Sequence, residues 1–65
     1  LEQYNILVQN CAQVVAQCQQ QLEEARASGD PGRIAEAEAV LTQALVNYET
    51  AVAQQQEAVN NALGG

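Results

Sequence analysis

Two cysteines are the side chains of this sequence best suited to chemistry, and their spacing excludes most of it. Cys11 and Cys18 are seven residues apart, or about 10.5 Å along a helix, whereas a disulfide needs Cα atoms within about 7 Å. A zinc site takes about four ligands and a catalytic thiol needs a neighbouring base, but the sequence contains no histidine. We therefore interpret both cysteines as small apolar core residues. The alternative is a disulfide between equivalent cysteines of two chains.

The carboxylates do not converge on a reacting centre either. Glu23 and Glu24 are neighbours in the sequence and diverge around a helix. A di-metal site in a helical bundle would use the Glu-x-x-His spacing, and this spacing is absent. The acids of the second half are spread over a polar side, apart from Glu38, which flanks a row of bulky apolar residues. We expect no enzymatic activity, no metal and no cofactor.

The elements that position these residues are set by one turn near the middle of the chain. Ser28-Gly29-Asp30-Pro31-Gly32 is the only interior cluster of turn-forming residues. Gly29 suits the left-handed conformation that ends a helix, Asp30 suits the N-cap of the next helix, and Pro31 suits its first position. The sequence predicts an all-α fold, a single antiparallel two-helix hairpin over residues 1–65. Its helices are expected over about 2–27 and 31–62, with the turn at 28–32.

In the first predicted helix, apolar residues recur in alternate steps of three and four. This heptad pattern is typical of a coiled coil, and its members are Leu1, Tyr4, Val8, Cys11, Val15, Cys18, Leu22 and Ala25. Leu7 and Val14 lie beside this stripe and widen it. A widened stripe indicates more than one neighbouring helix.

The second predicted helix carries two parallel rows of apolar residues. The bulky row consists of Ile34, Leu41, Leu45, Val52, Val59 and Leu63, with Tyr48 alongside. The other row has an alanine at every seventh position: Ala37, Ala44, Ala51 and Ala58. When the chain folds back at Pro31, these alanines meet, in order, Ala25, Cys18, Cys11 and Tyr4. We predict that these eight residues form a close-packed seam within the chain. The alternative is that the alanines reflect only high helix propensity.

The bulky residues outside this seam predict association. A single pair of helices has one interface for burying apolar side chains, and for so small a scaffold the balance of apolar burial against ordering entropy comes out near zero or worse. We expect an association surface made of Leu7, Val14, Ile34, Leu41, Leu45, Tyr48, Val52 and Val59. A dimer of hairpins, forming a four-helix bundle, is the closed solution, and a filament of hairpins is the open one.

The composition and charge of the chain exclude some classes of binding partner. The net charge is −6, from eight acids against two arginines, and phosphate binding needs a basic footprint that this sequence lacks. The apolar run Ile6-Leu7-Val8 is far shorter than the roughly 20 residues of a transmembrane helix. We therefore expect no nucleic-acid partner and no membrane insertion. The expected partner is another copy of this chain or another helical protein.

Two helices joined by Ser28-Gly29-Asp30-Pro31 resemble the needle subunits of bacterial type III secretion systems, which are also hairpins with Ser, Asp and Pro in the turn. The resemblance is one of architecture. It covers the turn, while the distances from the turn to the tyrosines and the scarcity of basic residues differ from those subunits.

The sequence as a whole supports two candidate functions. One is a structural subunit that self-associates into a bundle or filament. The other is a small adaptor or co-chaperone that binds a helix of a different protein, for example in a bacterial secretion apparatus. The sequence leaves the compartment open.

Overall fold

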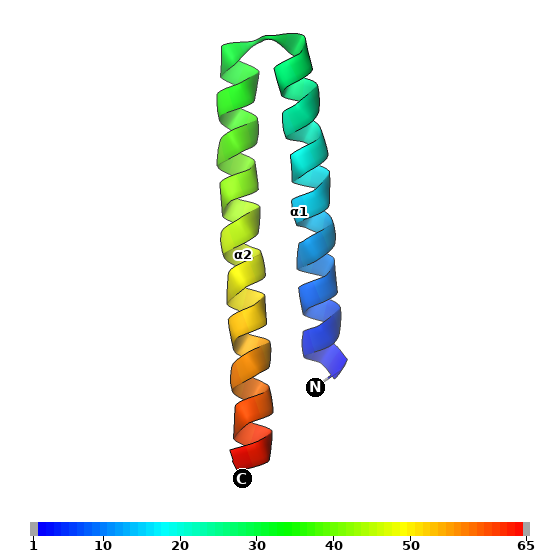
Figure 1. Ribbon diagram of the computed structural model, residues 1–65, viewed down its shortest axis with the longest axis vertical. Coiled ribbons are helices and arrows are strands. Elements are labelled where there is room, and N and C mark those ends of the chain that lie inside the picture. Colours follow the sequence, from blue (N-terminus) through cyan, green and yellow to red (C-terminus); the bar gives the residue numbers. More distant parts are fainter. Residues whose placement is uncertain (1, 65) are drawn as a thin grey trace.

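A computed structural model describes residues 2–64 as two antiparallel helices, α1 (Glu2–Ser28) and α2 (Pro31–Gly64), joined by a tight turn (Figure 1). The predicted all-α helical hairpin is confirmed. The hairpin measures 53 × 15 × 10 Å, and its long dimension is the length of α2 at about 1.5 Å per residue. α1 ends one residue, and α2 two residues, beyond the limits expected from the sequence.

Local chemistry at the turn accounts for both helix ends. Gly29 has a φ of 73°, and its N–H donates to the carbonyl oxygen of Arg26 at 3.1 Å. Asp30 caps α2: its Oδ1 accepts from the N–H of Gly32 at 2.9 Å, and its carbonyl oxygen accepts from the N–H of Ile34 at 3.0 Å. The Asp30 side chain thus binds one of the amides that a helix start leaves without a partner.

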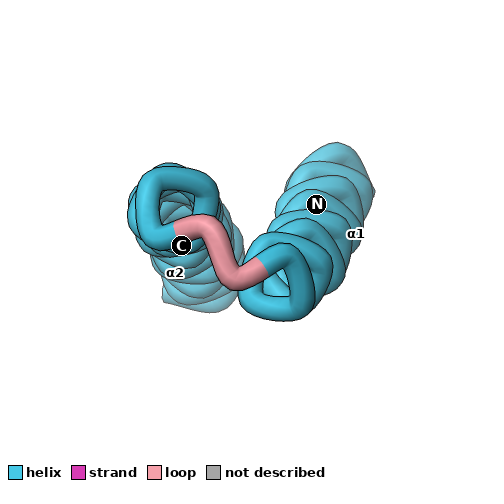
Figure 2. Tube along the Cα trace, turned by 90° about the horizontal axis from the view of Figure 1, so that it is seen from above, coloured by secondary structure: helices cyan, strands magenta, loops and turns pink. Residues whose placement is uncertain are grey.

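The core between the helices is small and consists mostly of small side chains. Among the described residues, five are buried: Cys18, Leu22, Ala25, Ala44 and Ala51. The three from α1 all lie in the half of that helix nearest the turn, and the first half of α1 contributes only half-buried side chains. Figure 2 shows that the two helix axes are inclined to each other. The burial of α1 side chains therefore increases toward the turn.

Candidate helix-packing surfaces

The structure places the eight predicted seam residues on the sides of α1 and α2 that the other helix covers. Four are buried and four half-buried: Cys18, Ala25, Ala44 and Ala51, then Tyr4, Cys11, Ala37 and Ala58. Ala25 and Ala37 line one groove, and Tyr4 and Ala58 line another. Each of these pairs lies across the boundary between the two helices. Small side chains thus occupy much of the line along which the two backbones approach each other.

This line of small residues separates two long faces of the hairpin. Successive residues of a helix are turned by about 100°, so Val14 and Val15 lie on opposite sides of it. Val15 lines a groove with Ala12, Leu45 and Tyr48. Val14 lines a different groove, whose other residues are Asn10, Cys11, Ala44 and Asn47.

We call the side that bears the groove around Val15 the apolar face. Its members share heptad positions with the residues of that groove: Val8, Ala12, Val15 and Leu22 from α1, and Ile34, Leu41, Leu45, Tyr48, Val52 and Val59 from α2. We call the opposite side the polar face. Its grooves are lined by Asn10, Val14, Gln21, Glu24, Arg33, Glu36, Val40, Asn47, Gln54, Glu57 and Asn61 together with seam residues.

The structure divides the predicted association surface between these two faces. Leu7 and Val14 share a heptad position on the polar face, and Val14 is 47% exposed there. The other six residues lie on the apolar face. Of these, Leu45 and Val52 are exposed, and the remaining four (Ile34, Leu41, Tyr48 and Val59) are half-buried within the hairpin. The cause is helical geometry, because the seam lies between the two groups. One partner helix pair cannot cover all eight residues at once.

Two features of the apolar face were missed by the sequence analysis. The small side chain of Ala12 forms part of the α1 wall of the groove that it shares with Val15, Leu45 and Tyr48. This groove has a volume of about 130 Å³. Near the end of the hairpin opposite the turn, the amide Nε2 of Gln55 donates to Oδ1 of Asn5, so a polar pair joins the two helices. Asn5 and Ala12 share a heptad position next to an apolar row, and Gln55 follows Tyr48 by seven residues. A helical wheel drawn for the two helices together would have placed them on this face.

The side chains that could bind a metal or react as nucleophiles lie apart from one another. Within residues 2–64, no three His, Cys, Asp or Glu side chains come together as a metal site. Cys11 and Cys18 are both free thiols, the first half-buried and the second buried. Over the same residues, neither helix combines the length and apolar character that crossing a bilayer requires.

Comparison of the chain with protein-family models, with curated proteins and with solved structures gives no match. The packing surfaces of the hairpin are therefore the basis for a functional assignment.

Proposed function

We propose that this chain is a non-enzymatic structural subunit that acts by packing its helices against copies of itself. The observation that carries this proposal is the apolar face, on which Leu45 is 40% and Val52 36% exposed. Leu22 is the only large aliphatic side chain buried in the core of residues 2–64. Full burial of a Val or Leu side chain is worth about 1.5–3 kcal/mol. Covering the apolar face therefore adds stabilisation that a lone hairpin lacks.

A closed dimer is the form we favour. Two hairpins packed through their apolar faces make a four-helix bundle, in which each copy covers the same surface of the other. The polar face, lined by side chains such as Glu24, Glu36 and Asn47, then stays in water. A filament needs a second and different contact surface. On the polar face, the candidates Val14 and Val40 stand among amide and carboxylate side chains.

Sedimentation equilibrium over a concentration series, with circular dichroism on the same samples, tests the proposal. We expect a dimer mass and a melting temperature that rises with protein concentration, because association stabilises the folded state by mass action. A helical monomer at every concentration would contradict self-association.

A matched pair of variants locates the contact. Val52→Gln and Val40→Gln make the same chemical change at two exposed positions, one on each face. We expect Val52→Gln to weaken the dimer about tenfold or more, since it removes one apolar contact from each chain, and Val40→Gln to leave it unchanged. Equal effects of the two variants would show that the apolar face is not the interface.

The groove formed by Ala12, Val15, Leu45 and Tyr48 favours a second candidate function. Both helices contribute apolar walls to it, and such a groove between helices accommodates the apolar side of a third helix. The chain would then be an adaptor or co-chaperone for a helix of a different protein, for example in a bacterial secretion apparatus. A weakly helical monomer that folds only when a helical partner is added would support this function.

A further inference from the structure

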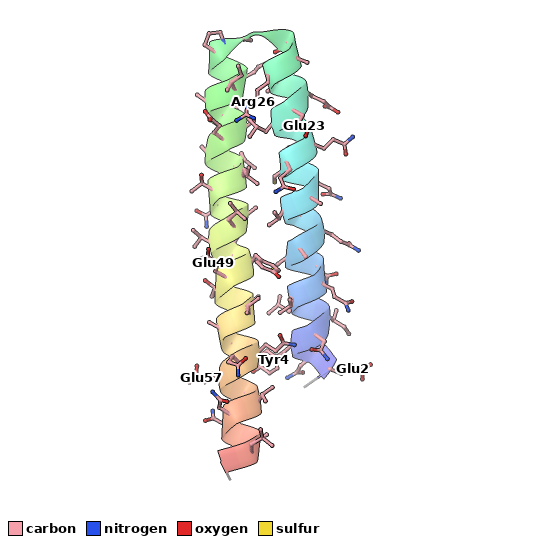
Figure 3. All side chains as sticks on the ribbon, viewed as in Figure 1. Glu2, Tyr4, Glu23, Arg26, Glu49 and Glu57 are labelled. Carbon is pink, nitrogen blue, oxygen red and sulfur yellow. The ribbon has the colours of Figure 1, made fainter. Side chains whose placement is uncertain are left out.

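The two edges of the apolar face carry different rows of residues. The edge on α1 is Asn5, Ala12, Gln19 and Arg26, and the edge on α2 is Glu38, Leu45, Val52 and Val59, each with a spacing of seven. The α1 row contains no bulky apolar residue, whereas the α2 row is bulky and apolar apart from Glu38. Arg26 and Glu38 are both exposed. Figure 3 shows the Arg26 side chain extending from α1 toward α2 near the turn.

Levels along the hairpin relate the two rows to each other. Ala25 and Ala37 line one groove. In this antiparallel pair Arg26 lies one residue nearer the turn than Ala25, and Glu38 one residue farther from the turn than Ala37. Because side chains lean toward the N-terminus of their own helix, the Arg26 and Glu38 side chains lean toward a common level. At the other end, Asn5 pairs with Gln55, so Val59 lies about 6 Å beyond the level of Asn5 along the axis. The two edge rows are therefore offset along the axis, and the long side chains of Arg26 and Glu38 are the ones able to bridge this offset.

Two copies can face each other through a two-fold axis in two ways. If both turns lie at the same end, α1 of each copy runs beside α2 of the other, and the axis preserves levels. Arg26 then lies beside Glu38 of the second chain. A positive edge position faces a negative one, and this contact occurs twice in the dimer.

If the turns lie at opposite ends, the α2 edge rows meet each other instead. Full alignment of these rows places the Glu38 carboxylate against Val59 of the second chain, where it loses water without gaining a partner. Sliding the chains until Glu38 is free leaves the start of α2, with Ile34, uncovered. In this arrangement, either the Glu38 carboxylate loses its contact with water or part of the apolar face stays uncovered.

We propose, on the basis of the self-association above, that two hairpins pair through their apolar faces with both turns at the same end, and that Arg26 of each chain forms an ion pair with Glu38 of the other. The partner is a second copy of this chain, since the two edges of the apolar face carry opposite charges near the turn, Arg26 on α1 and Glu38 on α2.

Mixing two charge variants tests this arrangement. In a dimer of the Arg26→Glu variant, two carboxylates meet at each contact, and in a dimer of Glu38→Arg, two guanidinium groups meet. We expect either variant alone to dimerise about 5- to 30-fold more weakly than the natural chain at low salt. An equimolar mixture forms a heterodimer in which both contacts again join opposite charges. The mixture should recover most of the affinity, less completely in 1 M NaCl because salt screens the pair.

The control pair is Arg33→Glu with Glu36→Arg, which makes the same changes in net charge on the polar face. Neither control variant, alone or mixed, should change the dimer. If mixing Arg26→Glu with Glu38→Arg restores nothing while the natural chain dimerises, the proposed arrangement is wrong and self-association stands. If the natural chain is a monomer, the proposed function itself fails.

A distance measurement gives a second readout that does not depend on the charge variants. Spin labels attached at residue 28 of each chain, in a background with both cysteines replaced by alanine, report the separation of the two turns. We expect a distance comparable with the width of a four-helix bundle. A separation approaching the 53 Å length of the hairpin would overturn the arrangement.

Discussion

At the scale of single residues, Gly29 is the position where backbone conformation leaves least choice. Its φ of 73° lies in the left-handed region, which L side chains enter at a cost of about 1–2 kcal/mol. A Cβ added there meets nothing within 4 Å. The strain is therefore the whole cost, and we expect Gly29→Ala to destabilise the hairpin by about 1 kcal/mol in thermal unfolding followed by circular dichroism at fixed concentration.

Gly32 supplies the matched control for this prediction. It lies in the first turn of α2 with ordinary helical backbone, and an added Cβ would lie 3.4 Å from Oδ1 of Asp30. We expect Gly32→Ala to stabilise the hairpin by up to about 1 kcal/mol, because alanine has the higher helix propensity. The same sign for both substitutions would contradict the role assigned to Gly29.

At the scale of the elements, the small side chains of α2 set how closely it approaches α1. Ala44 is 5% exposed and lies on the side of α2 that faces α1, so a larger side chain there presses against α1. We expect Ala44→Leu to destabilise the hairpin by about 1–3 kcal/mol through overpacking, measured by thermal unfolding. Ala53→Leu is the control: Ala53 is exposed, and the added side chain should change stability by less than about 0.5 kcal/mol. Equal losses in the two variants would show that α1 and α2 are not held close at Ala44.

The sequence was sufficient for the turn and for the helix pair, because both depend on local chemistry. Glycine, aspartate and proline at positions 29–31 each act on the backbone within a few residues, and α2 starts at Pro31 as expected. The low exposure of Ala44 and Ala51 likewise follows a period that can be seen in α2 alone.

The division of the surface into faces depends on both helices at once. Leu7 and Val14 widen the stripe of α1 on one side, but which residues of α2 share that side depends on the antiparallel placement of α2. Burial also varies along α1, since Tyr4 is half-buried while Ala25 is buried. A heptad pattern treats these two positions as equivalent, and only the placed helices distinguish them.

At the scale of the whole molecule, contact between the helices is uneven along α1, and the two cysteines report this difference. Cys18 is buried in the half nearest the turn, while Cys11 is half-buried and lines a groove on the polar face. We expect Cys11 to react with a thiol reagent at least tenfold faster than Cys18, because Cys18 needs the helices to separate first. Labelling rates of the single variants Cys11→Ser and Cys18→Ala measure the difference. Equal rates in native protein would show that the hairpin opens along its whole length.

The start of α1 and the end of α2 lie at the same end of the molecule, opposite the turn (Figure 1). A force that pulls these two ends apart therefore acts across the helices and peels them from each other one layer at a time, beginning at Tyr4 and Ala58. A force between the turn and either end acts along the helix axes instead. The hairpin should consequently yield to a weak pull at its ends and unzip gradually, reaching Cys18 and Ala44 only after the outer layers have parted.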